Sequence, residues 1–182
     1  MEFFTLFLKK FLRYILKPLS FIPALVMMYF IISFSSQTGA ESGSLSYDVS
    51  KILILAYNKV LMKGYDNWTL NELIALIHPY VRKFAHVAEY FLLASCVSFP
   101  LYVYRLRGLA LTLTAGIFCI GFACMDEYFQ TFINGRVGTP RDVAIDTIGI
   151  LAGIIAVRIV GFIGRKTIFS FLSLEKKEVH SF

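Results

Sequence analysis

Charged residues are scarce in this sequence. Of its 182 residues, 16% are Asp, Glu, Lys or Arg and 57% are hydrophobic, and the mean hydropathy is positive. Water-soluble domains carry roughly 25% charged residues. The composition therefore excludes a soluble domain of this size, and much of the chain is expected to have lipid as its solvent.

Cysteine is rare as well, and no two cysteines form a CxxC pair. Cys96, Cys119 and Cys124 all lie within apolar runs. Disulfide frameworks and structural zinc sites need several cysteines or histidines at short, regular spacing, so neither is expected here. We interpret all three cysteines as buried apolar side chains.

Acidic residues are outnumbered by basic ones, 12 to 18, which gives a formal net charge of +6. The sequence has no basic helix interleaved with aromatic residues of the kind that follows a phosphate backbone, so we expect no nucleic-acid partner. Membrane orientation explains the excess, because basic residues are retained on the cytoplasmic side of a membrane.

Long hydrophobic runs are what the sequence does contain. Four runs approach the roughly 20 residues that a helix needs to cross about 30 Å of hydrocarbon. The predicted transmembrane segments are 19–36, 84–104, 109–126 and 143–164. The predicted fold class is an all-α membrane protein, a four-transmembrane-helix bundle that forms a single domain over residues 1–182.

Both ends of the chain are predicted to be cytoplasmic. Residues 1–18 form a basic segment suited to the inner membrane surface, and residues 165–182 form a charged tail. This orientation places 11 of the 18 Lys and Arg residues in or toward the cytoplasm. The alternative for the first run is a cleavable signal peptide, since Thr38, Gly39 and Ala40 follow it, but its length favours a span.

The stretch of about 48 residues between the first two spans is predicted to form short outer amphipathic helices, because a structureless connector of that length is uncommon. Apolar residues recur at helical spacing from Val49 to Leu61, which predicts the first of these helices. Ser46 or Asp48 is its expected cap, and Gly64 is placed to end it.

A second outer helix is predicted from a capping box. Thr69 is followed three residues later by Glu72, and apolar residues continue from there. Pro79 is expected to interrupt this helix before the second span begins. Both outer helices are expected to lie on the membrane or to cover the bundle.

Polar residues gather at one end of the predicted spans. His86 lies four residues after Arg82, and Asp146 lies four residues after Asp142, so each pair shares a helix face. Ionisable groups near lipid are costly unless they are paired or hydrated, so they mark a functional site. The candidate catalytic residues are His86, Glu89, Asp126, Glu127, Asp142 and Asp146, and the candidate ligand-binding residues are Arg82, Tyr90, Gln130, Arg136 and Arg141.

A structural explanation competes with this functional one. Arg82, Arg136 and Arg141 can neutralise the carboxylates in an ion-pair network that only locks the bundle. His86 taken alone is as compatible with a hydrogen-bonded interfacial histidine as with a catalytic or ligand role.

Small residues form a face on the predicted fourth span. Gly149 and Gly153 lie four residues apart, with Ala152 and Ala156 beside them. Such a face lets two helix backbones approach closely, so we interpret it as a packing surface rather than as a ligand contact.

The polar motifs occur in a specific order along the chain. In sequence they are Phe34, Ser35, Ser36, Gln37; Arg82, Lys83, Phe84, Ala85, His86, Glu89, Tyr90; Asp126, Glu127, Gln130; and Gly135, Arg136, Asp142, Asp146, Gly149, Gly153. This series, from about Ser33 to Gly153, resembles the VanZ-like family of bacterial membrane proteins. Many members have a histidine where this chain has Phe129 and a proline where it has Asn134. Phe129 argues against a metal site or proton relay that uses that histidine.

The resemblance implies residence in the bacterial plasma membrane as a multi-pass protein. For the family's namesake it also implies low-level resistance to teicoplanin, a lipidated glycopeptide antibiotic. Most members lie outside resistance clusters, so a housekeeping role in the cell envelope is expected for this chain.

Three hypotheses of function remain. The first is a site open to the outer leaflet that binds or processes lipid-linked envelope precursors or anionic lipid, with the arginines holding a phosphate or carboxylate and His86 moving protons with Glu89 or Asp126. The second is a non-catalytic assembly or shielding factor. The third is transport, which is disfavoured because the middle of the spans holds no series of charges.

No cofactor is specified by the sequence. If the site is enzymatic, hard carboxylate ligands would suit magnesium or calcium. The carboxylates available for such an ion are Asp126, Glu127, Asp142 and Asp146.

Overall fold

The structure is a computed structural model that describes residue 11 and residues 17–178, with side chains described as far as residue 163. The predictions for the basic segment 1–18 and the tail 165–182 therefore fall largely outside the described residues. What is described of them is Phe11, Lys17, Pro18 and the helical backbone of residues 165–178.

The described residues form five helices. They are α2 (Ile22–Ser35), α3 (Gly39–Val60), α4 (Asn67–Val103), α5 (Gly108–Gln130) and α6 (Pro140–Glu178). Four segments are long and apolar enough to cross a membrane: Lys17–Ser35, Asn67–Val103, Gly108–Gln130 and Pro140–Ile163. The predicted fold class, an all-α membrane protein with four spans, is confirmed.

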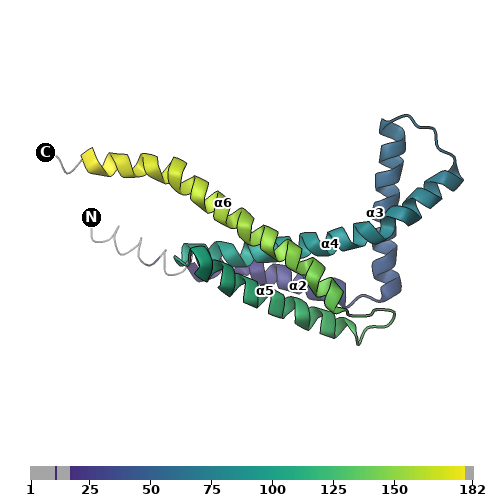
Figure 1. The fold of residues 1–182 in the computed structure, drawn as a ribbon, viewed down its shortest axis with the longest axis horizontal. Coiled ribbons are helices and arrows are strands. Elements are labelled where there is room, and N and C mark those ends of the chain that lie inside the picture. Colours follow the sequence, from purple (N-terminus) through teal and green to yellow (C-terminus); the bar gives the residue numbers. More distant parts are fainter. Residues whose placement is uncertain (1–10, 12–16, 179–182) are drawn as a thin grey trace.

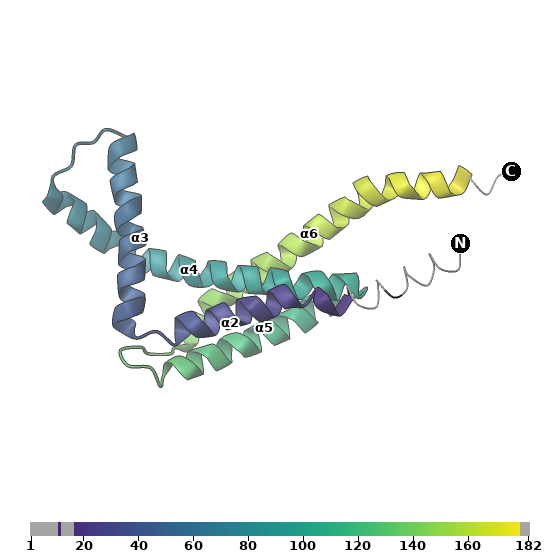
Figure 2. The same cartoon turned by 180° about the vertical axis from the view of Figure 1, so that it is seen from behind.

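Helices α2, α4, α5 and α6 form an elongated bundle, and α3 lies across one end of it (Figure 1). α2 and α5 run in one direction and α4 and α6 in the other, so α2 begins and α6 ends at the same end of the bundle. The most extensive packing is that of α4 on α6. The end of α2, the start of α3 and the loop from α5 to α6 all meet at the opposite end (Figure 2).

The close packing of α4 and α6 depends on the predicted small-residue face. A Cβ atom at Gly149 would lie 2.2 Å from the carbonyl oxygen of Val87, and one at Gly153 would lie 2.4 Å from that of Phe91. Any side chain at these two positions would therefore separate the helix backbones. The interpretation of this face as a packing surface is confirmed.

The first outer helix, α3, begins earlier than expected. Thr38 caps it: its Oγ1 accepts a hydrogen bond from the backbone N–H of Glu41, and the Glu41 carboxylate accepts one from the backbone N–H of Thr38. Ser46 and Asp48, the predicted caps, lie inside the helix. The serine-rich stretch before Val49 is thus helical as well, because this capping box lies ahead of it.

The second predicted outer helix is the first part of α4, which runs through Pro79 without a break. Its N-cap is Asp66 rather than Thr69, and the Asp66 carboxylate accepts a hydrogen bond from the Thr69 backbone N–H. Contacts of Leu70 and Ile74 with Ile54 of α3 hold the turns before Pro79 in place. At 1.5 Å per residue, the 37 residues of α4 extend for about 55 Å, well beyond a bilayer core.

One expectation about the cysteines is wrong. Cys119 is buried and Cys96 is partly buried, but Cys124 is exposed on α5. In lipid an apolar residue is stable on either face of a helix, so an apolar run does not show which residues face the core.

Candidate functional site

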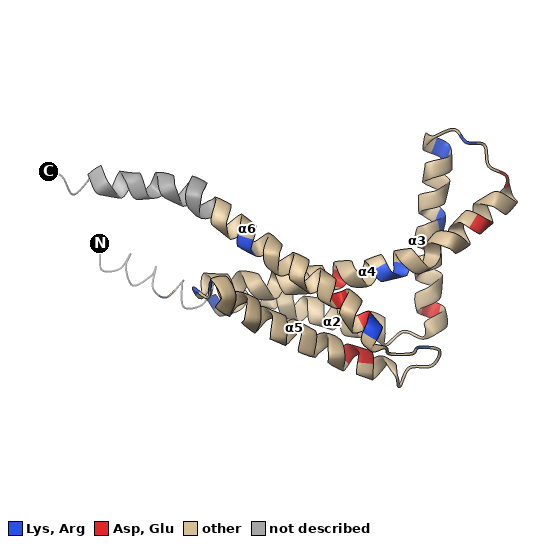
Figure 3. Ribbon diagram, in the orientation of Figure 1, with Lys and Arg blue, Asp and Glu red and all other residues tan. Residues whose placement is uncertain are grey.

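The buried polar residues of the bundle concentrate at the end where α3 crosses it. Figure 3 shows acidic and basic residues of α4, α5 and α6 side by side there. Besides Tyr90, this end contains six buried polar residues: Ser35, Asp126, Glu127, Gln130, Arg136 and Asp146. Each must be hydrogen-bonded, paired or bound to a ligand, because an isolated polar group is costly in a low-dielectric interior.

Asp126 is a hydrogen-bonding centre for three helices. Its Oδ2 accepts from Ser35 Oγ of α2 at 2.9 Å, from Tyr90 OH of α4 at 3.3 Å and from Gln130 Nε2 of α5 at 3.1 Å. Its Oδ1 is buried and has no hydrogen-bond partner among the described residues. One oxygen of Asp126 thus has a clear structural role.

Glu127 connects the end of α5 to the start of α6. Its Oε1 accepts a hydrogen bond from Gln130 Nε2 at 3.2 Å, and its Oε2 accepts one from the backbone N–H of Thr139 at 3.0 Å. The loop approaches closely here, since a Cβ atom at Gly138 would lie 1.9 Å from the Glu127 carbonyl oxygen. Glu127 is 5% exposed.

Asp142 lies in the first turn of α6, which Thr139 caps. Thr139 Oγ1 donates to Asp142 Oδ2 at 2.9 Å, and the backbone N–H of Asp142 donates to Thr139 Oγ1 at 3.2 Å. This arrangement places a carboxylate at the positive end of the helix dipole, with Pro140 in the first turn. The pattern Thr, Pro, any residue, Asp is a signal from which this helix start could have been predicted.

Asp146 lies one turn deeper and is fully buried. Neither of its carboxylate oxygens has a hydrogen-bond partner among the described residues. The nearest basic atom is His86 Nδ1, 3.9 Å from Asp146 Oδ1 and itself buried. Within the described part of the chain, this is the only contact under 4.0 Å between a basic nitrogen and a carboxylate oxygen.

In the described part of the chain, no arginine nitrogen lies within 4.0 Å of a carboxylate oxygen. Arg136 is 8% exposed and donates from one terminal nitrogen to the carbonyl oxygen of Phe34, at the end of α2, at 2.9 Å. Its Nε is buried and has no partner among the described residues. Burial, and then the positive charge of Arg82, lower the pKa of Arg136 below its usual value. An anion beside Arg136 would favour the charged guanidinium and so raise its pKa again.

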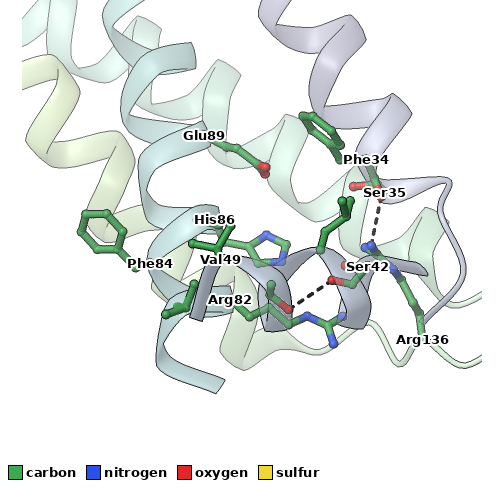
Figure 4. A pocket seen from close by; sticks show the side chains of 13 residues that line it. Phe34, Ser35, Ser42, Val49, Arg82, Phe84, His86, Glu89 and Arg136 are labelled. Carbon is green, nitrogen blue, oxygen red and sulfur yellow. Dashed lines mark hydrogen bonds between the residues drawn. The ribbon is translucent and has the colours of Figure 1, made fainter. Parts of the chain in front are cut away.

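Among the cavities that adjoin these residues, two contain Arg82, His86 and Arg136 in their lining. The first, here called the apolar cavity, has a volume of about 290 Å³ and lies between α2, α3 and α4 (Figure 4). Its lining consists of Phe34, Ser35, Ser42, Leu45, Ser46, Val49, Val81, Arg82, Phe84, Ala85, His86, Glu89 and Arg136.

The second cavity, here called the polar cavity, has a volume of about 280 Å³. It is lined by Pro79, Arg82, Lys83, His86, Glu127, Gln130, Gly135, Arg136, Val137 and Asp142. Arg82, His86 and Arg136 line both cavities and so form the wall that they share.

The structure brings most of the candidate residues to this place. Arg82, His86, Glu89, Glu127, Gln130, Arg136 and Asp142 line the cavities, and Tyr90, Asp126 and Asp146 are buried in the same end of the bundle. Arg141 is exposed on α6, outside both linings.

Sequence reasoning overlooked the contribution of α3. Ser42 and Ser46 line the apolar cavity, and Ser46 Oγ lies 2.8 Å from His78 Nε2, which joins α3 to α4. The signal was present, because Ser42, Ser46 and Ser50 recur every four residues on one helix face.

Four helices able to cross a membrane, with a buried polar cluster and two cavities at one end, define a multi-pass integral membrane protein. The chain belongs to the VanZ/LLP1 family, whose model matches residues 20–161. All eleven candidate residues lie within that match. Searches of the curated proteins and of the solved structures gave no match.

Proposed function

We propose that this protein binds the anionic headgroup of a lipid-linked cell-envelope component, or of an anionic lipid, at the polar end of the bundle. The observation that carries this proposal is the shared wall of the two cavities, where Arg82, His86 and Arg136 meet. Arginine binds phosphate and carboxylate with a planar set of donors, which makes it the residue best suited to such a headgroup.

The charge balance of the wall favours an anion. Arg136 uses one nitrogen on a backbone carbonyl and keeps Nε buried with no partner in the described chain. Lys83 adds a further cation to the polar cavity. A phosphate oxygen would supply the acceptor that Arg136 lacks.

The apolar cavity suits the lipid part of the same ligand. Phe34, Leu45, Val49 and Phe84 line it with side chains that are 43%, 50%, 48% and 73% exposed, so it opens on the surface of the bundle. A hydrocarbon chain could lie in this opening while its headgroup contacts Arg82 and Arg136 (Figure 4). Apolar lining with a few convergent polar groups is typical of a ligand site.

We further propose that the site faces the outside of a bacterial plasma membrane and that both termini are cytoplasmic. At the opposite end of the bundle, Lys17 lies over the ring of Tyr104, and Arg107 lies over the ring of Tyr102. Arg158 lines the same cavity as Arg107 and Tyr102. A cluster of basic residues beside the spans is typical of a cytoplasmic face.

Membership in the VanZ/LLP1 family supports a further proposal, a link to low-level resistance against teicoplanin-type glycopeptides. Such antibiotics carry a lipid tail, so a protein that binds lipid-linked envelope components at the outer leaflet would act where they act.

A purely structural role is favoured for one oxygen of Asp126, which joins α2, α4 and α5.

The proposal is tested by lipid binding to the purified protein in detergent. Polyprenyl phosphate and phosphatidylglycerol are titrated, with phosphatidylethanolamine as the zwitterionic comparison, and native mass spectrometry counts bound lipid. We expect one anionic lipid per chain, and at least tenfold weaker binding in Arg82→Gln and Arg136→Gln, about 1.4 kcal/mol.

Arg141→Gln is the matched control, because Arg141 has the same charge and lies at the same end but outside both cavities. Equal binding of all three lipids, or an equal loss in all three arginine variants, would contradict the proposed site. Preference for polyprenyl phosphate over phosphatidylglycerol would identify an envelope precursor as the ligand.

A further inference from the structure

Three side chains from three helices converge beside the polar cavity. His86 of α4, Glu127 of α5 and Asp146 of α6 each offer one ligand atom, and these atoms all lie within 4.8 Å of one another. Glu127 and Asp146 are buried, and the His86 side chain is 21% exposed.

Direct contacts do not account for this cluster. Both Asp146 oxygens and His86 Nδ1 are buried with no hydrogen-bond partner in the part of the chain that the structure describes. The 3.9 Å between His86 Nδ1 and Asp146 Oδ1 is too long for a hydrogen bond. A fully buried carboxylate at this depth requires a partner, and a cation between the two groups would serve both.

We propose that His86, Glu127 and Asp146 hold a divalent transition-metal ion. One imidazole nitrogen with two carboxylate oxygens is a donor set for zinc or manganese, whereas magnesium and calcium take oxygen ligands. The set differs from the four carboxylates suggested by sequence: the Asp142 carboxylate accepts from the Thr139 hydroxyl, and Asp126 lies outside the cluster.

The three ligand atoms must move closer together to bind such an ion. In the tetrahedral geometry that zinc prefers, bonds of roughly 2.1 Å place ligand atoms about 3.4 Å apart. Separations of up to 4.8 Å therefore close by up to about 1.4 Å when the ion binds. Each Glu127 oxygen accepts one hydrogen bond and keeps a second lone pair for the metal.

The charge of the cluster and its access to the polar cavity also suit a divalent ion. Two carboxylates neutralise a divalent ion, so the buried end of the bundle gains no net charge from the site. His86 and Glu127 line the polar cavity, so the remaining coordination positions face that cavity and can take water or an anionic ligand. The metal site stands on its own contacts and does not depend on lipid binding.

The test is metal binding to the purified full chain in detergent after chelation. Equilibrium dialysis against Zn²⁺, Mn²⁺, Mg²⁺ and Ca²⁺, with metal counted by mass spectrometry, should give one Zn²⁺ or Mn²⁺ per chain. His86→Ala, Glu127→Gln and Asp146→Asn should each bind at least tenfold more weakly. Asp142→Asn tests the alternative set of carboxylates. Asp48→Asn is the matched control and should bind as the wild type does, because Asp48 is exposed on α3 and lines neither cavity.

A second measurement needs no variant. In the Mn²⁺-loaded wild-type protein, pulsed EPR should show coupling to the nitrogen of one imidazole. The proposal is overturned by absence of stoichiometric Zn²⁺ and Mn²⁺ binding, which would leave Asp146 as a neutral, protonated acid. Absence of the nitrogen coupling, or dependence of binding on Asp142 instead of His86, would overturn it as well. Loss of lipid binding with metal binding retained would contradict only the proposed function.

Discussion

At the scale of single residues, two aspartates of α6 have different surroundings because they lie one helical turn apart. Asp142 lies in the first turn of α6, where its carboxylate accepts a hydrogen bond from the hydroxyl of Thr139, the residue that caps the helix. Asp146 lies one turn further and is fully buried, 3.9 Å from His86. A charged carboxylate at the deeper position lowers the stability of the bundle, so Asp146 is not retained for stability. Replacing Asp146 is therefore the best way to separate function from stability.

We expect Asp146→Asn to abolish the envelope phenotype of the protein, for instance raised teicoplanin tolerance on overexpression, while membrane insertion stays intact. Removing a buried charge does not hinder insertion of a helix. The measurement is the minimum inhibitory concentration together with an immunoblot of the membrane fraction. Wild-type tolerance in a variant present at wild-type level would argue for a structural role of the cluster.

The hydrogen-bonding centre at Asp126 leads to a stability prediction. Tyr90→Phe removes one of the three donors to Asp126 Oδ2 and should cost about 1 kcal/mol of unfolding free energy. Asp126→Ala leaves Ser35 and Tyr90 without this acceptor and removes one acceptor of Gln130, and it should cost about 3 kcal/mol. Reversible unfolding in mixed detergent micelles measures both. Equal stability of the two variants would show that Asp126 does not join the helices.

At the scale of elements, the approach of α6 to α4 depends on two glycines, Gly149 and Gly153, which lie against backbone carbonyls of α4. This contact sets how α6 is rotated about its own axis. The rotation in turn directs Asp146 toward His86 and leaves Arg141 exposed. Packing between two elements thus determines the composition of the site.

Gly149→Ala should therefore destabilise the protein by about 1 to 3 kcal/mol, because the new methyl group would lie 2.2 Å from the Val87 carbonyl oxygen. Gly121→Ala on α5 is the matched control, since no atom lies within 4 Å of its added Cβ, and it should be neutral or slightly stabilising. Thermal unfolding in detergent measures both. A similar shift in melting temperature for the two variants would exclude close packing as the cause.

The start of α3 should depend on pH. The hydrogen bond from the Thr38 backbone lowers the pKa of Glu41 below its ordinary value of 4.5. A lowered folded-state pKa gives stability that is present above 4.5 and lost as the pH falls through the folded value. Hydrogen-exchange protection of the first turn of α3, corrected for intrinsic rates, should fall below pH 4.5. Glu41→Gln should show no such fall, and an unchanged wild-type profile would contradict the capping role.

At the scale of the whole molecule, the antiparallel course of the four spans brings the end of α2, the middle of α4, the end of α5 and the start of α6 to one level (Figures 1 and 2). α3 lies across that level and contributes Ser42 and Ser46 to the apolar cavity. The site is thus assembled from all five described helices, and its orientation in the membrane decides which compartment it serves.

Topology reporters test that orientation. Fusions after Arg107 and after Lys166 should report the cytoplasm, and fusions near Gly64 and Gly138 should report the outside, because basic residues beside the spans are retained inside. Alkaline phosphatase and a fluorescent protein, active on opposite sides, provide the paired measurement. An outside signal at Arg107 would reverse the orientation and place the polar cavity in the cytoplasm.

The sequence by itself determined the four spans and the end of the bundle where polar residues gather. A run of about 20 apolar residues satisfies its own backbone hydrogen bonds as a helix in lipid, so its placement needs no knowledge of its neighbours. The alternating direction of successive spans then carries the Ser35, His86, Gln130 and Asp142 regions to the same side. The same motifs indicated the VanZ-like family, and the match of the VanZ/LLP1 family model to residues 20–161 confirms it.

Only the tertiary structure decided which of these residues meet. Arg136 reaches the cavities because its loop folds back on α2 and α3, where it donates to the Phe34 carbonyl and where Asn134 accepts from Gly39. Arg141, equally basic in the sequence, is exposed. Helical spacing specifies which residues share a face, but the direction in which that face turns depends on side chains of other helices, and those contacts exist only in the packed bundle.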